Sequence, residues 1–249
     1  MEETATATIK FSIAGDEIET QVTVPRGPTS PRTLLPFFRA VAEAVVDRGV
    51  RQAELAGAQV SCRKGCGACC RQLVPIAPSE AHQIGDVVEA MPEPRRSVIR
   101  ERFAAARDKL AAAGLIETLE SPEGAADASL RQLGLDYFAL GIACPFLEDE
   151  SCSIYEERPI ACREYLVTSP AEACARPTAA TVRCVDLPAK ASNAVSRLDE
   201  GSGGRFIPWV PLVLAPEWSR SNPEGPPKLM GPELLQRFFA RLAEPAQPP

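Results

Sequence analysis

Residues 62–70 read CRKGCGACC, so four cysteines stand within nine residues. The segment is too irregular and too rich in glycine for a helix, which predicts a loop. Thiolates two or three residues apart on such a loop can converge on one centre, because Gly65 and Gly67 permit backbone turns that other residues resist. This spacing is typical of both zinc sites and iron–sulfur sites.

A second group of cysteines occurs in residues 144–165, which read CPFLEDESCSIYEERPIACREY. The gaps of seven and nine residues between its cysteines are too wide to build a site by local geometry, so this group needs the first one. Together the groups offer up to seven thiols, more than one tetrahedral zinc ion can use. Either a polynuclear centre is present, or several of these cysteines are packing residues. The candidate metal ligands are Cys62, Cys66, Cys69, Cys70, Cys144, Cys152 and Cys162.

The spacing supports some cysteines better than others. The adjacent residues Cys69 and Cys70 cannot easily bind one mononuclear ion together, because neighbouring side chains tend to diverge. One of the two is expected to be a ligand, and the other is a core thiol, a ligand of a second centre or a reactive group. Cys174 and Cys184 have no tight spacing, so replacing either is expected to leave the metal content nearly intact.

Basic residues accompany both cysteine groups in a chain whose net charge is −6. A site of several thiolates stays negative even with its metal, so nearby cations lower its energetic cost. Pro159 is expected to open a short helix that sets the neighbouring arginines near the site. The candidate cofactor-binding residues are Arg63, Lys64, Arg158 and Arg163. An ordinary role on a solvated surface is the alternative for each of them.

The composition argues against several other classes of protein. The acidic net charge argues against a nucleic-acid binder that works through a broad basic face. The chain has nine cysteines and one histidine, His82, which falls on the polar side of its predicted helix and is expected to be exposed. Catalytic triads and His-rich metal sites are therefore poor candidates. The nucleophile-elbow, P-loop and dinucleotide-binding motifs are also missing from the sequence.

The sequence also predicts where the protein works. Its first residues lack the basic start and the apolar run of a signal peptide, and no apolar stretch approaches the length of a membrane-spanning helix. We therefore expect a soluble, cytoplasmic protein with no membrane partner. In a reducing compartment, grouped cysteines are more often metal ligands or redox centres than disulfides.

Apolar periodicity predicts a mainly α fold of the α+β class, an irregular helical domain around a cysteine-ligated metal centre with a small N-terminal β-hairpin. Residues 6–24 alternate like a hairpin that turns at Ala14–Asp16, and the prolines of residues 25–31 argue against regular pairing there. Helices are predicted over residues 32–56, 79–91 and 95–113, within 125–140, and from Gly231 onwards. The predicted domains are 1–31, the hairpin and linker; 32–200, the cysteine-cluster metal-binding domain; and 201–249, a proline-rich extension with one helix.

Taken together, CRKGCGACC and CPFLEDESCSIYEERPIACREY resemble the YkgJ-type cysteine-cluster family, also called the CxxCxxCC or zinc- or iron-chelating domain. The resemblance covers residues from about 62 to 166 and implies that all seven cysteines of the two groups belong to the cluster. The first gap here holds three residues, where the family name implies two, so the placement of Cys62 is the weakest part of the match. The family is related to flagellin lysine N-methylases, which are thought to use an iron–sulfur centre with S-adenosylmethionine.

These observations predict a metal-binding protein that carries an iron–sulfur cluster, for example of the 4Fe-4S type, held by thiolates from two loops. Two alternatives stay open. One is a structural zinc-binding module for protein interaction, and the other is an iron–sulfur-dependent protein lysine methyltransferase, which the resemblance alone suggests. We expect a binding partner that is a protein or a small molecule, whose identity the sequence does not give. The sequence also does not decide whether the chain is an enzyme.

Overall fold

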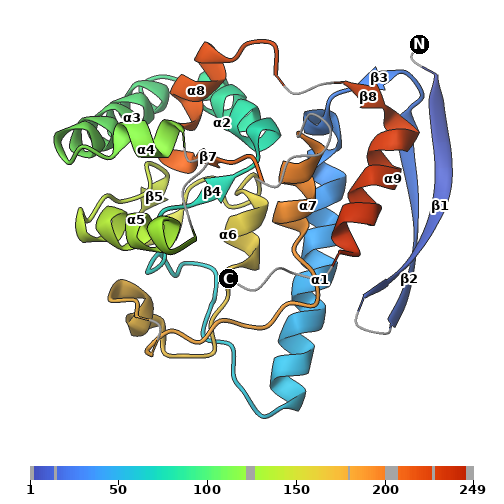
Figure 1. Ribbon diagram of the computed structural model, residues 1–249, viewed down its shortest axis with the longest axis horizontal. Coiled ribbons are helices and arrows are strands. Elements are labelled where there is room, and N and C mark those ends of the chain that lie inside the picture. Colours follow the sequence, from blue (N-terminus) through green and yellow to red (C-terminus); the bar gives the residue numbers. More distant parts are fainter. Residues whose placement is uncertain are drawn as a thin grey trace.

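The N-terminal part of the chain forms an antiparallel hairpin of strands β1 (Thr4–Ile13) and β2 (Asp16–Pro25), as Figure 1 shows. This computed structural model describes residues 3–13, 16–121, 127–178, 180–199, 207–225 and 228–244. Apolar and polar residues alternate along both strands, and one apolar face packs against the helices behind it. The predicted hairpin is confirmed, while residues 14 and 15 of its turn lie outside the described residues.

The hairpin covers a group of three helices, α1 (Leu35–Leu55), α7 (Ala191–Leu198) and α9 (Gly231–Leu242). A short 3₁₀ turn, η1 (Pro31–Leu34), precedes α1. The predicted apolar faces of α1 and α9 are both buried, and Phe38 of α1 stacks on Phe238 of α9 at 4.3 Å between ring centroids. The periodicity of 3.6 residues therefore predicted both long helices correctly.

A second group of helices lies on the other side of α1, at the left of Figure 1. It consists of α2 (Pro78–Ala90), α3 (Arg95–Ala112), α4 (Ile116–Glu120), α5 (Asp127–Ala139) and α8 (Ala215–Ser221). A 3₁₀ turn, η3 (Leu212–Leu214), supplies apolar side chains between them. The predicted helices at 79–91, 95–113 and within 125–140 are confirmed, whereas α4, α7 and α8 were not predicted.

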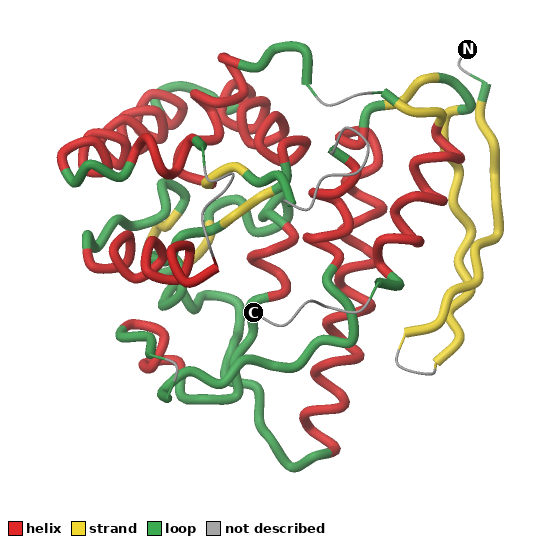
Figure 2. Tube along the Cα trace, viewed as in Figure 1, coloured by secondary structure: helices red, strands yellow, loops and turns green. Residues whose placement is uncertain are grey.

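Short pairs of strands tie distant segments together, as the tube in Figure 2 shows. Strand β3 (Pro28–Thr29) pairs with β8 (Leu229–Met230), and β4 (Pro75–Ile76) pairs with β7 (Val210–Pro211). The prediction that residues 25–31 form no regular pairing is therefore wrong for three residues, because Pro25 ends β2 and Pro28 and Thr29 form β3. Proline is tolerated there because a two-stranded pair has only edge strands, where an amide hydrogen is not always needed.

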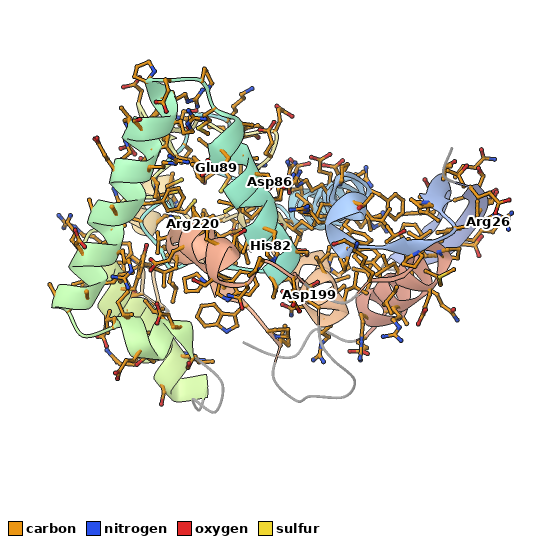
Figure 3. All side chains as sticks on the ribbon, turned by 90° about the horizontal axis from the view of Figure 1, so that it is seen from above. Arg26, His82, Asp86, Glu89, Asp199 and Arg220 are labelled. Carbon is orange, nitrogen blue, oxygen red and sulfur yellow. The ribbon has the colours of Figure 1, made fainter. Side chains whose placement is uncertain are left out.

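The single histidine is buried, which corrects the expectation that it is exposed. His82 is only 6% exposed because α8 lies over it, with the Trp218 ring 5.2 Å away and the Ser219 hydroxyl 3.0 Å from Nδ1. Figure 3 shows His82 on α2, with Asp199 beside the N-terminal end of the same helix. The helical periodicity placed His82 on a polar face, but it could not show that a late segment of the chain covers that face.

Among the helices of the described ranges, none is both long and apolar enough to cross a membrane. The fold is mainly α with a small β part, as predicted. The division of the chain into the segments 1–31, 32–200 and 201–249 stays a prediction. In the described residues, one apolar core contains side chains from β2, α1, α7 and α9 together.

Candidate metal centre

The first cysteine loop follows α1 and is built from consecutive turns. Backbone hydrogen bonds join Cys66 to Arg63, Cys70 to Gly67 and Gln72 to Cys69, with N···O distances of 2.9–3.1 Å. Gly65 has φ +85°, a left-handed conformation that glycine adopts without strain. The predicted loop is therefore confirmed, and its turns bring four thiols close in space.

The second cysteine loop contains a small hairpin of β5 (Leu147–Glu148) and β6 (Ser151–Cys152), followed by helix α6 (Ile160–Glu164). Asp149 and Glu150 both have positive φ, 49° and 55°, as a type I′ turn requires. Pro159 stands at the N-terminal cap of α6, so the helix expected there is confirmed. Asp149 and Glu150 thus have a structural role, because they make the turn that places Cys152 opposite Leu147.

The two loops are in direct contact. The backbone N–H of Cys144 donates to the carbonyl of Cys70 at 2.7 Å, and the Arg71 guanidinium pairs with the Glu150 carboxylate at 2.6 Å. Gly67 lies so close to the hairpin that a Cβ atom built on it would be 2.6 Å from the Leu147 side chain. The sequence prediction that the second group needs the first is consistent with this contact, which joins segments more than 70 residues apart.

Five thiols lie near one another where the loops meet, and we call them the inner thiols: Cys69, Cys70, Cys144, Cys152 and Cys162. Burial raises the pKa of the Cys144 thiol to about 12. The pKa of Cys162 rises well above its usual range, through burial first and then through the nearby Cys144 and Cys69. By contrast, a hydrogen bond with Cys70 lowers the pKa of Cys69 to about 7. A group of mostly neutral, mutually close thiols results.

Four further thiols, the outer thiols, border this group: Cys62, Cys66, Cys174 and Cys184. Burial raises the pKa of Cys174 to about 11, and the nearby Cys69 and Cys62 add to the shift. Val167 connects this side of the site, because its N–H donates to the Cys62 sulfur at 3.3 Å and its backbone forms an isolated antiparallel bridge with Cys184. Spacing along the chain gave no signal that Cys174 and Cys184 lie beside the first loop.

Backbone amides point at several of the sulfur atoms. Besides Val167 with Cys62, the amide of Phe146 is hydrogen-bonded to the Cys144 thiol, and that of Ile154 to the Cys152 thiol. Each of these bonds lowers the pKa of its thiol, against the larger effect of burial. Hydrogen bonds to sulfur also stabilise the charged thiolate that a metal needs, and they tune iron–sulfur centres.

The basic residues predicted to bind a cofactor occupy different places. The positive charge of Arg158 lowers the pKa of Cys69 and Cys152, and its guanidinium lies 4.1 Å from the centre of the Tyr155 ring. Lys64 also lies over that ring, at 4.9 Å. Arg163 is buried and donates to the Glu43 carboxylate and to backbone carbonyls, while Arg63 is exposed. The cofactor role of all four stays a prediction, and Arg158 is the one whose charge acts on the thiols.

Two buried carboxylates hold α6 in place, and the sequence pattern did not identify either of them. Glu80 of α2 accepts from the backbone N–H of Ile160 at 2.8 Å and from that of Ala77 at 3.1 Å. Glu164, at the end of α6, accepts from the N–H of Ala191 at 2.6 Å, where α7 begins. Burial raises the pKa of both carboxyl groups. Helix α6, which carries Cys162, is thereby fixed between the two groups of helices.

The residues present fit a thiolate-bound metal in their chemistry and in their common location. The donors are thiols without a competing histidine, and backbone amides and the Arg158 charge are in place to stabilise thiolates. Within the described residues, however, no three His, Cys, Asp or Glu side chains are arranged to hold a metal ion as they stand.

Comparison with known proteins bears directly on this cysteine cluster. The family described as "CxxCxxCC: Putative zinc- or iron-chelating domain" matches residues 61–184. The match extends past the residue 166 expected from the sequence and therefore includes Cys174 and Cys184. Neither the curated proteins nor the solved structures give a significant match to the chain. Residues 61–184 therefore form a cysteine-cluster domain of the CxxCxxCC family, which is described as zinc- or iron-chelating.

Proposed function

We propose that the chain binds an iron–sulfur cluster through thiolates of its two cysteine loops. The observation that carries the proposal is the number of thiols in one place, since five inner thiols exceed the four that a tetrahedral zinc ion uses. Cysteine thiolates are the usual ligands of iron–sulfur clusters, and one cluster needs four of them. The surplus leaves thiols for a second role beside the cluster.

The backbone amides aimed at Cys62, Cys144 and Cys152 support the same proposal. Hydrogen bonds to sulfur are one of the ways in which a protein sets the reduction potential of such a cluster. The nearby charge of Arg158 offsets part of the negative charge that several thiolates bring. A structural zinc ion held by four of the same cysteines is the second candidate, favoured by the family description, which names both metals.

The experiment that tests the proposal is a metal and sulfide analysis of the full chain purified without oxygen. The expected result is iron with a matching amount of acid-labile sulfide, together with visible absorption that disappears on exposure to a chelator and an oxidant. Colourless protein that holds one zinc ion per chain and no sulfide would contradict the proposal and leave zinc as the bound metal. Because zinc is closed-shell and has no redox chemistry in proteins, the two results cannot be confused.

A further inference from the structure

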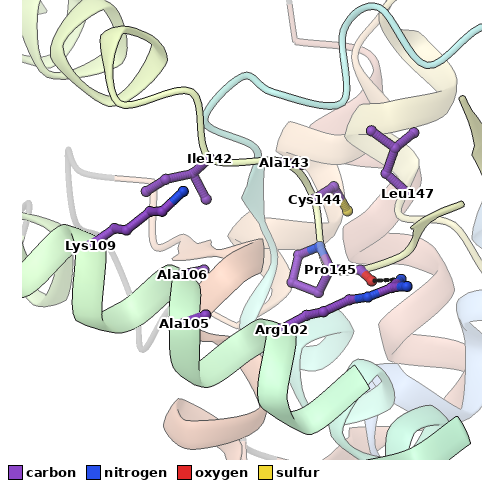
Figure 4. A pocket seen from close by; sticks show the side chains of 9 residues that line it. All are labelled: Arg102, Ala105, Ala106, Lys109, Ile142, Ala143, Cys144, Pro145 and Leu147. Carbon is purple, nitrogen blue, oxygen red and sulfur yellow. Dashed lines mark hydrogen bonds between the residues drawn. The ribbon is translucent and has the colours of Figure 1, made fainter. Parts of the chain in front are cut away.

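A cavity of about 370 Å³ lies between helix α3 and the start of the second cysteine loop. Figure 4 shows α3 on one side and residues 142–147 on the other. The volume is within the range of small-molecule sites in proteins. No residue of the first cysteine loop lines the cavity.

The floor of this cavity is apolar. Small side chains of α3, Ala105 and Ala106, face Ile142 and Pro145 of the opposite segment. The gap exists because alanines stand at positions where α3 approaches the loop, and a larger side chain would fill it. Such a floor suits the hydrocarbon part of a ligand, since covering it removes apolar surface from water.

The two ends of the cavity carry cations that differ in their surroundings. Figure 4 shows Arg102 beside Pro145, and its guanidinium donates to the Pro145 carbonyl at 3.1 Å and lies 3.4 Å from a Glu148 oxygen. Lys109 lies at the other end, beside Ile142. No hydrogen bond or ion pair joins its ammonium group to any residue that the structure describes. Arg102 is thus engaged with the protein, whereas Lys109 is available to a ligand.

Cys144, one of the inner thiols, also lines the cavity. Its backbone N–H donates a hydrogen bond to the Cys70 carbonyl of the first loop, so this wall of the cavity is part of the contact between the two loops. Lys109 stands seven positions after Arg102 in α3, which corresponds to roughly 10 Å along the helix. A ligand that starts at Lys109 and follows the floor therefore ends beside Cys144.

We propose that this cavity binds a small organic monoanion. Its anionic group pairs with Lys109, and its hydrocarbon part lies on Ala105, Ala106 and Ile142 with its far end toward Cys144. A ligand with a second anionic group at that far end fits less well, because the Glu148 carboxylate already stands at Arg102. Binding of this anion does not require a metal. It rests on the proposed function only in that the bound molecule would lie beside the metal centre.

Binding of hexanoate to the full, metal-loaded chain tests this site, with hexylamine and adipate as probes of charge. Titrations followed by NMR are expected to show saturable binding of hexanoate, weaker binding of adipate and none of hexylamine. Lys109→Met should weaken hexanoate binding by about tenfold, the loss of one charge-assisted hydrogen bond. Lys228→Met, which removes the same charge from an exposed position near β8, should leave the affinity unchanged.

No saturable binding of hexanoate, equal binding of hexanoate and hexylamine, or an unchanged affinity in Lys109→Met would each overturn the proposal. Tighter binding of adipate would overturn the choice of a monoanion. The metal content of every sample is measured alongside, because it separates the two proposals. Protein that contains iron and sulfide but does not bind hexanoate would have the proposed function without this site. Metal-free protein that binds hexanoate through Lys109 would have this site without the proposed function.

Discussion

At the scale of single residues, the cysteines differ in surroundings and therefore in expected importance. Cys144 is buried among the inner thiols, and its sulfur accepts a hydrogen bond from the Phe146 amide. Cys184, by contrast, is exposed at the edge of the site. Cys144→Ser should therefore remove most of the bound metal, and Cys184→Ser should leave it nearly intact. Metal analysis of the two variants, purified in parallel, checks this difference. Equal losses in both would show that the division into inner and outer thiols is wrong.

Asp199 gives a prediction for the dependence of stability on pH. Burial raises the pKa of its carboxyl group to about 7, above the 3.8 of an exposed aspartate, although the Ser79 amide donates to Oδ2 at 2.8 Å. Its Oδ1 atom is buried and has no hydrogen-bond partner among the described residues. The folded protein therefore binds a proton here more tightly than the unfolded chain does. This contribution stabilises the folded state at low pH and is lost as the pH rises from about 4 to about 7.

Asp199→Asn removes the buried charge and keeps an oxygen that can accept from Ser79. We expect the variant to be more stable than the parent protein above pH 7, by on the order of 2 kcal/mol, and to lose this advantage near pH 4. Urea unfolding at both pH values measures the difference. A variant that is destabilised equally at the two pH values would contradict the assignment of a raised pKa to Asp199.

At the scale of elements, the close approach of the two cysteine loops depends on Gly67. A Cβ atom at this position would lie 2.6 Å from the Leu147 side chain and 2.8 Å from the Glu150 carbonyl oxygen, and the carbonyl cannot move without disturbing the β5–β6 turn. Gly67→Ala should therefore push the loops apart, lower the stability by about 1–3 kcal/mol and reduce the metal content.

Gly134→Ala is the matched control, because Gly134 lies within α5 and a Cβ atom there would meet nothing within 4 Å. That substitution should leave the metal content unchanged and raise the helix stability slightly. Thermal unfolding and metal analysis of both variants check the pair of expectations. If Gly67→Ala retains metal and stability as well as Gly134→Ala does, the contact between the loops does not organise the site.

The elements also show which parts of the fold the sequence could predict. Helix α3 repeats apolar residues at Ile99, Phe103, Ala106 and Leu110 and ends before Gly114, so local pattern alone predicts it. Helix α8 has seven residues and a proline in its first turn, too little for a periodicity. Its place over His82 follows from packing between distant segments, and so does the pairing of β3 with β8. Such contacts leave no local signal in the chain.

In the candidate site, too, local sequence pattern predicted some features, and contacts between distant segments decided the others. The short spacing of the first four cysteines identified one loop, and the wide gaps of the second group indicated that it needs the first. The position of Cys174 beside Cys62 and Cys69 depends on how residues 166–178 fold back toward the first loop. Glu80 is another such case, because a buried carboxylate that caps α6 from 80 residues away looks like any glutamate near the start of a helix.

At the scale of the whole molecule, helix α6 of the second cysteine loop is hydrogen-bonded to both groups of helices, through Glu80 of α2 and through Ala191 of α7. Thiolate coordination of a structural metal can supply on the order of 10 kcal/mol, and a domain of this kind is stable by only about 5–15 kcal/mol. Removing the metal with a chelator should therefore lower the melting temperature. It should also expose residues 61–165 to protease before α1 is cut. An unchanged melting temperature and cleavage pattern would make the centre an accessory to the fold.

We propose that thiolates from both loops hold one polynuclear iron–sulfur centre. X-ray absorption at the iron edge of the anaerobically purified full chain tests it most directly, because the fine structure reports both the ligand atoms and any neighbouring iron. The expected spectrum shows a first shell made of sulfur alone and a second shell of iron scatterers. A shell containing nitrogen or oxygen ligands without iron neighbours, or protein whose only metal is zinc, would contradict it.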